Sequence, residues 1–331
     1  MSPAILRRGL LALALASLAV AAGLACEAAA QQPAAQTAPV AAPLAAPPAG
    51  KLQGFASAEA AANALTEALR GGDDTAVSAM LGESWRDFVP GSQEDEDRAR
   101  AKYLTGWDAN HKVVVSDDAR ATIEAGTTGW TMPIPIVKDG AEWRFDVAAG
   151  RKEIEARRIG HNELAVVQTL LAIVDAQREY ATLDPMKVGV PHYARRLLSS
   201  PGKKDGLYWE AAPGAPESPL GPAVAKAQAQ PQAKGEPAEG YYGYHFRLLY
   251  GQGPAAHGGA HDYLIKGRMI AGFAVIARPV DYGKTGVMTF IVNQHGDVYE
   301  QDLGADTAKR AQAITLFDPG KGWEKADMTP P

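Results

Sequence analysis

Apolar residues recur with two different spacings along the chain, and the change between these spacings marks its first elements. Between residues 55 and 110 they return every three or four positions, as on one face of a helix, and the first such face carries Ala60, Ala64, Leu65 and Leu69. From Lys112 the spacing shortens to two, which is typical of half-buried strands. Helices followed by antiparallel strands indicate an α+β domain.

Capping residues predict where these helices begin and end. Ser57 is expected to cap the first helix, which stops at Gly71-Gly72, and Asp73 or Asp74 is expected to cap the second. An acidic run at residues 94–97 precedes three basic residues, an order that favours the dipole of a third helix. We interpret this run as a solvated helix face rather than as an acidic metal site.

Four strands are expected next, over residues 113–115, 119–125, 130–138 and 142–147. Asp139-Gly140 is a tight-turn signal between the last two strands. Pro133 and Pro135 carry no N–H group, so the third strand should lie at an edge or contain a bulge.

The second half begins with a helix from His161 or Asn162 to Tyr180, whose apolar residues cover most of its circumference. Such a helix is buried against other elements, and this one is too short and too often interrupted by polar residues to span a bilayer. Six prolines in residues 211–239 predict a flexible insertion rather than a core element. Strands are expected at residues 244–250, 263–266, 271–277, 287–293 and 297–301, with His295-Gly296 in the last turn.

These patterns predict an α+β chain of two domains. We place a domain of helices and antiparallel sheet at residues 51–155, and a domain with one long helix on an antiparallel sheet at residues 156–331. The length of 331 residues permits two domains, and the contents of 46% hydrophobic and 21% charged residues are those of a globular protein. The net charge of −5 lacks the basic excess that nucleic-acid binding requires, so no nucleic-acid partner is expected.

The N-terminal residues have the layout of an export signal. Arg7 and Arg8 precede an apolar run at residues 10–24, and small residues follow up to residue 30. The run is shorter than the roughly 20 residues that span a bilayer, so we expect cleavage of a signal peptide at residues 1–30 and no transmembrane anchor afterwards. The paired arginines also fit the twin-arginine route, although the strongly apolar run favours the general route. The localisation expected is therefore the periplasm or the cell exterior.

Residues 31–50 contain eight Ala, five Pro and no charge, which predicts a disordered tether. The one cysteine, Cys26, excludes disulfide frameworks and four-cysteine zinc sites. A lipid anchor on Cys26 is an alternative to cleavage after Ala30. It is disfavoured because Gly23 occupies the position where a lipidation signal has a large aliphatic residue.

The sequence contains only weak matches to familiar catalytic and cofactor-binding motifs. Gly251-x-Gly253-Pro254 is a poor phosphate loop, because proline removes a donor and a strand rather than a helix is expected next. His257, His261 and Asp262 suggest a metal cluster, but Gly258-Gly259 between the histidines favours a solvated loop. We therefore expect no catalytic residue, no cofactor and no bound metal.

Two classes of function stay open. The first is a non-enzymatic envelope protein that binds another protein, or assists its assembly, through a loop of the second domain. The candidate contacts are Lys203, Lys204, Asp205, Tyr208 and Trp209, because exposed Trp and Tyr often anchor interfaces. Packing of this loop onto its own sheet is the alternative for these residues. The second class is a small-ligand binder or enzyme that uses a cavity of the first domain, with Asp108, His111 and Asp146 as candidates.

Two local resemblances agree with the expected folds. The motifs Trp130-x-Met132-Pro133 and Gly140-x-x-Trp143-Arg144-Phe145-Asp146 resemble the nuclear-transport-factor-2-like superfamily, which implies a cone-shaped first domain. The segment Thr289-Phe290-Ile291-Val292-Asn293-Gln294-x-Gly296-x-Val298-Tyr299 resembles the globular heads of type IV pilins and pseudopilins. A pilin carries its apolar helix at the very N-terminus, whereas here the helix is internal, so assembly into a filament by the pilin route is not expected.

Longer strings resemble a bacterial family known as domain of unknown function 2950 over nearly all of the mature chain. They are residues 199–209, residues 217–222, Gly267-Arg268-Met269-Ile270-x-Gly272-Phe273 and the closing hairpin. The resemblance implies no assigned activity. It suggests an Asp-rich stretch able to hold calcium where this chain has residues 184–189. Only Asp184 and Gly189 of such a stretch are present and Lys187 adds a repelling charge, so we expect no calcium here.

Overall fold

The computed structural model describes residues 52–326 except for residues 90, 118, 213, 215, 216, 223 and 225–239. The expected signal peptide with Cys26, the tether and most of the insertion after residue 222 lie outside the described residues. The chain is α+β, as expected, with antiparallel sheets and helices in both halves.

Three helices and a short 3₁₀ helix open the first half: α1 (Ala58–Gly71), α2 (Asp74–Leu81), η1 (Trp85–Phe88) and α3 (Gln93–Ala109). The predicted caps are confirmed. The Ser57 side chain accepts the N–H of Ala60 at the start of α1, and Asp73 accepts the N–H of Ala76 at the start of α2.

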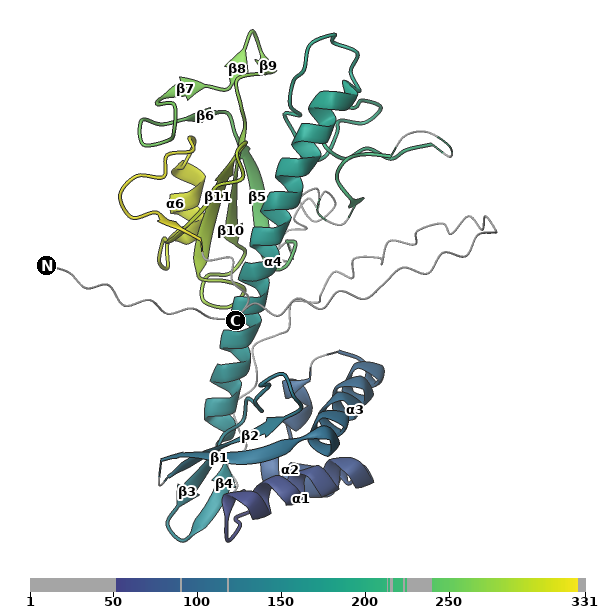
Figure 1. Cartoon of the computed structure of the whole chain (residues 1–331), viewed down its shortest axis with the longest axis vertical. Coiled ribbons are helices and arrows are strands. Elements are labelled where there is room, and N and C mark those ends of the chain that lie inside the picture. Colours follow the sequence, from purple (N-terminus) through teal and green to yellow (C-terminus); the bar gives the residue numbers. More distant parts are fainter. Residues whose placement is uncertain are drawn as a thin grey trace, which may run out of the picture. The chain divides into compact units, whose positions relative to one another are not determined.

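A four-stranded antiparallel sheet follows in the order β1 (His111–Asp117), β2 (Arg120–Ala125), β3 (Ile136–Asp139) and β4 (Glu142–Phe145). β3 begins only after Pro135, because the prolines before it cannot donate to a ladder. The expected turn at Gly140 joins β3 to β4, with Gly140 at φ 66°. Helices α1, α2 and α3 cover one face of this sheet (Figure 1), and Leu65, Ile123 and Ile136 are fully buried between them.

The long helix α4 (Val147–Leu183) differs most from the sequence-based expectation. We expected it to begin near His161, but it starts at Val147, directly after the first sheet. Asp146 makes this early start possible, because its carboxylate accepts the N–H of Ala149 at 2.9 Å. The expected boundary at residues 155 and 156 therefore falls inside a continuous helix.

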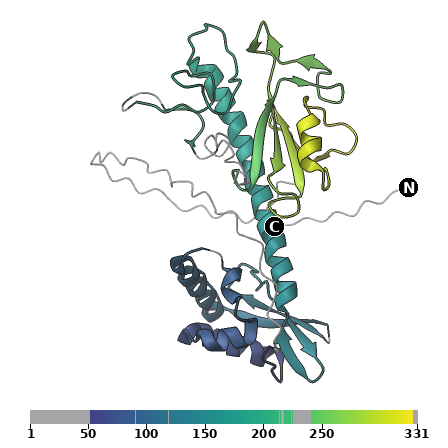
Figure 2. The same cartoon turned by 180° about the vertical axis from the view of Figure 1, so that it is seen from behind.

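The second half contains a five-stranded antiparallel sheet in the order β13-β12-β11-β10-β5. Its strands are β5 (Tyr244–Leu249), β10 (Ala274–Pro279), β11 (Met288–Asn293), β12 (Val298–Asp302) and β13 (Glu324–Lys325). Helix α4 lies on one face and α6 (Thr307–Ala313) on the other (Figures 1 and 2). Two small ladders extend this half: β6 (Gly251–Gln252) with β7 (His261–Asp262), and β8 (Leu264–Ile265) with β9 (Arg268–Met269).

Each half has its own cluster of buried apolar residues, and the two clusters share none. Along the sequence, the last member of the first cluster is Val147 and the first member of the second cluster is Val166, and both residues lie on α4. This separation supports two domains, whose independent folding stays a prediction. Over the described residues, none of the helices combines the length and apolar character that crossing a bilayer requires.

The insertion at residues 211–239 is not wholly a flexible excursion, and that prediction was wrong for its first part. Leu220 and Val224 belong to the second hydrophobic cluster, and the N–H of Leu220 donates to the carbonyl of Leu207 at 3.0 Å. The prolines near these residues led us to expect a flexible loop, but burial of the two aliphatic side chains offsets part of the cost of ordering the backbone around them.

Candidate functional site

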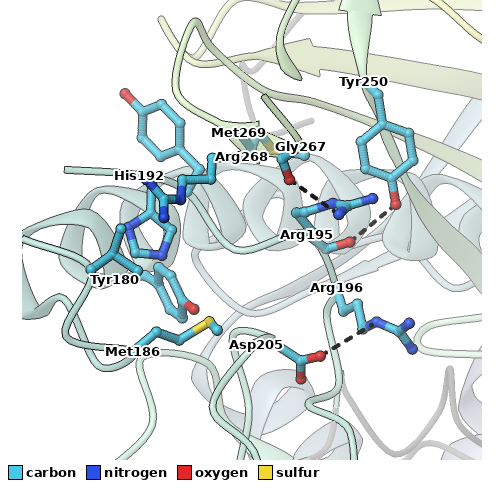
Figure 3. A pocket seen from close by; sticks show the side chains of 12 residues that line it. Tyr180, Met186, His192, Arg195, Arg196, Asp205, Tyr250, Gly267, Arg268 and Met269 are labelled. Atoms are coloured by element: carbon cyan, nitrogen blue, oxygen red, sulfur yellow. Dashed lines mark hydrogen bonds and ion pairs between the residues drawn. The ribbon is translucent and has the colours of Figure 1, made fainter. Parts of the chain in front are cut away.

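A cleft of about 490 Å³ lies beside the C-terminal end of α4 (Figure 3). Its lining comes from three places in the sequence: residues 180–205, Tyr250 after β5, and residues 267–269 at the turn between β8 and β9. Aromatic and aliphatic side chains line it together with three arginines. Two of the strings that resemble the family, residues 199–209 and 267–273, contribute to this lining.

Gln177 holds the central segment of the cleft in place. This fully buried side chain donates to the carbonyl of Ala194 at 3.0 Å and accepts the N–H of Ala194 at 2.8 Å. On the other side of the segment, the N–H of Tyr193 donates to the carbonyl of Met269 at 2.8 Å. The two anchors fix the backbone from which Arg195 and Arg196 project.

The three arginines of the cleft differ in their partners. Arg196 lies 3.8 Å from the carboxylate of Asp205. Arg195 donates to the carbonyl of Gly267 at 3.2 Å and stands 5.9 Å from the centre of the Tyr250 ring. The guanidinium of Arg268 makes no ion pair or hydrogen bond with any residue that the structure describes.

Asp205 supplies a carboxylate to the lining of the cleft, and its surroundings favour the ionised form. Burial by itself would raise its pKa, but the N–H of Ser200 at 2.7 Å and the hydroxyl of Ser200 at 2.9 Å both donate to it. Together with the charge of Arg196, these hydrogen bonds lower the pKa of Asp205 below its ordinary value. Burial, followed by the charges of two nearby carboxylates, raises the pKa of Tyr180 to about 12, so its hydroxyl stays neutral and donates to the carbonyl of Lys204 at 2.6 Å.

His192 lines the same cleft and is almost completely buried, with 6% of its surface exposed. Its Nδ1 lies 3.1 Å from the carbonyl of Val190, which can only accept, so Nδ1 carries a proton. Its Nε2 is buried and has no hydrogen-bond partner among the described residues. The ring packs edge-on against Tyr180, with 5.6 Å between the ring centres.

The segment suggested as a calcium loop has another role. Asp184 ends α4 in a left-handed conformation, and its two oxygens accept the N–H groups of Val188 at 2.9 Å and Gly189 at 2.7 Å. The hydrogen bond from Gly189, then that from Val188, lowers the pKa of Asp184. Its carboxylate thus organises the loop. Within the described part of the chain, no three His, Cys, Asp or Glu side chains converge as metal ligands would.

The five predicted contact residues are not one exposed surface. Trp209 was expected to be an exposed anchor, and this is wrong: it is 7% exposed and belongs to the second hydrophobic cluster. The ammonium of Lys204 lies 5.1 Å from its ring centre, so Lys204 covers the indole. Tyr208 is half-buried and its N–H donates to the carbonyl of Leu197 at 2.9 Å, whereas Lys203 is exposed.

Of that set, Asp205 lies in the cleft. The loop folds onto its own chain because Gly206 lets it approach closely: a Cβ at Gly206 would lie 2.6 Å from the carbonyl carbon of Leu198. The partner-binding role of the set as a whole stays a prediction.

The candidates in the first half each have a structural contact. Asp108 receives two hydrogen bonds from Arg70, at 2.7 and 3.2 Å, and the bond from Arg70 lowers its pKa despite a smaller opposing effect of burial. His111 is exposed and stacks on Trp107 at 3.9 Å, and Asp146 caps α4.

The suggested metal residues are likewise dispersed. His261 and Asp262 are exposed neighbours in β7, while the His257 ring lies 6.2 Å from that of His295.

Sequence reasoning missed the arginines and the histidine of the cleft. Arg195-Arg196 lies two residues before the loop that begins at Ser199, and Arg268 follows Gly267 at a turn, but nothing in their spacing links positions more than 70 residues apart. His192 carried no signal, because a single histidine beside a proline is typical of many loops.

Comparison with known proteins identifies the family to which this chain is similar. A family model described as "Protein of unknown function (DUF2950)" matches residues 52–326. No curated protein and no solved structure matches the chain.

Proposed function

This chain belongs to the DUF2950 family, and we propose that it is an exported, non-enzymatic protein of the cell envelope that binds an acidic segment of a partner protein. Export is supported by the paired arginines, the apolar run and the small residues at positions 1–30. The binding role is supported by the cleft beside α4.

One observation carries the proposal: three arginines line the cleft and Asp205 is the carboxylate among them. A concave surface with an excess of one charge concentrates the field and attracts ligands of the opposite charge. Since the whole chain has a net charge of −5, the positive cleft is a local feature rather than a reflection of composition.

The apolar residues around the cleft favour a protein as partner. Met186 and Tyr250 line it, yet they are 47% and 41% exposed. Aromatic residues, Met and Arg are the types enriched where proteins contact each other. The alternative, a ligand site or enzyme in the first half, has less support because Asp108, His111 and Asp146 already have structural contacts.

Site-specific cross-linking in living cells tests the binding proposal. A photoreactive phenylalanine derivative replaces Tyr250 in the full-length chain, and the same group replaces Val115, an exposed residue of β1. We expect a cross-linked protein from position 250, with the adduct mapped to an acidic segment, and loss of that adduct in Arg268→Glu.

No adduct at position 250, or an adduct that Arg268→Glu leaves unchanged, would overturn the proposal. The same adduct at position 115 would do so too. Export is tested by mass spectrometry of the native protein, for which we expect an N-terminus near Gln31. An intact Met1 in the cytoplasmic fraction would contradict export.

A further inference from the structure

We infer that the cleft selects a segment in which two carboxylates flank an apolar residue. This inference rests on the proposed function and names the chemistry of the partner. Its basis is the placement of the two arginines without a carboxylate partner: Figure 3 shows Arg268 on the side of His192, and Arg195 on the side of Tyr250.

Arg195 is a preorganised site for one carboxylate. Its guanidinium is held by the carbonyl of Gly267 at 3.2 Å, and the hydroxyl of Tyr250 donates to the carbonyl of Arg195 at 3.0 Å. A guanidinium has five N–H donors, so further donors remain available after this contact. Because the side chain is already ordered, binding a carboxylate costs little additional conformational entropy.

Arg268 is the site for the second carboxylate. It is exposed on β9, and its guanidinium has no partner among the described residues. The backbone beneath it is firm, because β9 pairs with β8 and the carbonyl of Met269 accepts the N–H of Tyr193.

Arg196 is not counted as a third site. Asp205 lies 3.8 Å from it and is ionised, so the pair is close to neutral. The pair therefore adds no net positive charge at this edge of the cleft, which limits the preference to two carboxylates rather than to a long acidic run.

Apolar side chains also line the cleft. Tyr180, Met186 and Met269 line the cleft, and Figure 3 shows Met186 and the Tyr180 ring below Arg268. An apolar residue placed between two acidic residues would bury its side chain against Met186, which is 47% exposed, whereas Tyr180 and Met269 are already almost fully buried. Methionine suits this role, since its flexible thioether adapts to different side chains.

An anionic membrane surface is the competing partner, because exposed apolar residues beside cations also bind lipid headgroups. A cleft of 490 Å³ is concave, however, and concave sites enclose a ligand rather than lie on a plane. The geometry therefore favours a peptide.

The test measures binding of the mature full-length chain to three seven-residue peptides with blocked ends. Their central residues are Glu-Leu-Glu, Glu-Leu-Gln and Gln-Leu-Gln, flanked by alanines, and phosphatidylglycerol vesicles are the fourth probe. We expect the doubly acidic peptide to bind about two- to fivefold more tightly than the singly acidic one, as for one exposed ion pair, with the difference shrinking in high salt.

Variants assign the carboxylates to their arginines. Arg268→Gln and Arg195→Gln should each remove the preference for two carboxylates over one, while Arg195→Lys, which keeps the charge, should retain part of it. Arg98→Gln is the matched control, an exposed arginine on α3 outside the cleft, and should change nothing. A melting curve for each variant verifies that it is folded.

Equal affinity for one and two carboxylates would overturn the inference, as would absence of peptide binding up to millimolar concentration. Binding to vesicles but not to peptides would assign the surface to a membrane instead. These outcomes are separate from the cross-linking result: an adduct at position 250 with no peptide preference removes this inference and leaves the proposed function, whereas no adduct removes both.

Discussion

Replacing Trp209 by alanine should destabilise the second half of the chain rather than weaken a contact with a partner. The indole is 7% exposed, packs against Tyr180 with 6.4 Å between ring centres, and is covered by the ammonium of Lys204. Truncation of a buried Trp to Ala costs about 3–5 kcal/mol, because the cavity collapses only in part.

A matched variant separates ring packing from the polar atom. The indole Nε1 is buried without a hydrogen-bond partner among the described residues, so phenylalanine removes an unsatisfied donor while it keeps an aromatic ring. We therefore expect Trp209→Phe to cost about 1–2 kcal/mol, clearly less than the alanine variant.

Urea unfolding followed by far-UV circular dichroism measures both free energies of unfolding. In thermal scans the alanine variant should melt about 6–20 °C lower, at about 2–4 °C per kcal/mol for a domain of this size. If Trp209→Ala unfolded within about 1 kcal/mol of the wild type, the side chain would not be part of the core. Trp209 would then again be a candidate for an exposed residue that contacts a partner.

Three further predictions concern α4 and the cleft. A Cβ at Gly160 would meet nothing within 4 Å, so Gly160→Ala should raise the free energy of unfolding by about 1 kcal/mol, because alanine favours a helix more than glycine does. A Cβ at Gly150 would lie 2.7 Å from Ile134, so Gly150→Ala should lower the free energy of unfolding by about 1–3 kcal/mol. Equal effects of these two substitutions in urea unfolding would contradict the packing of α4. Gln177→Leu leaves the N–H and the carbonyl of Ala194 unpaired and should cost about 2–4 kcal/mol in urea unfolding; a neutral result would mean that this segment is not fixed by Gln177. The folded-state pKa of Asp184 is lowered, so its stabilisation is present above the unfolded-state pKa and is lost as the pH falls through the folded-state value. Asp184→Asn should therefore be less stable than the wild type at pH 7, and the difference should fade in acid; melting curves with a constant difference down to pH 2 would disprove this linkage.

Much of the local structure was predictable, because it depends on neighbouring residues. Ser57 and Asp73 cap the first two helices as expected, and Asp146 caps α4, since a cap needs only an acceptor at the right place before a helix. The class α+β followed from the change in hydrophobic period. The true start of α4 was missed because residues 147–160 carry a mixture of charged and apolar residues with no long apolar face.

The α+β class, the family resemblance and most helix and strand positions could be predicted from the amino-acid sequence, because they depend on local pattern. Which loop residues are buried, and which side chains come into contact, depends instead on how the whole chain packs. Trp209 was expected at the surface because its neighbours are lysines and glycines, but Lys204 covers it and Gly206 lets the loop close over the core. Arg195 and Arg268 come to one cleft through the pairing of Tyr193 with Met269. Long-range backbone pairing of this kind follows from the packing of the whole chain, so no local spacing in the sequence could reveal it.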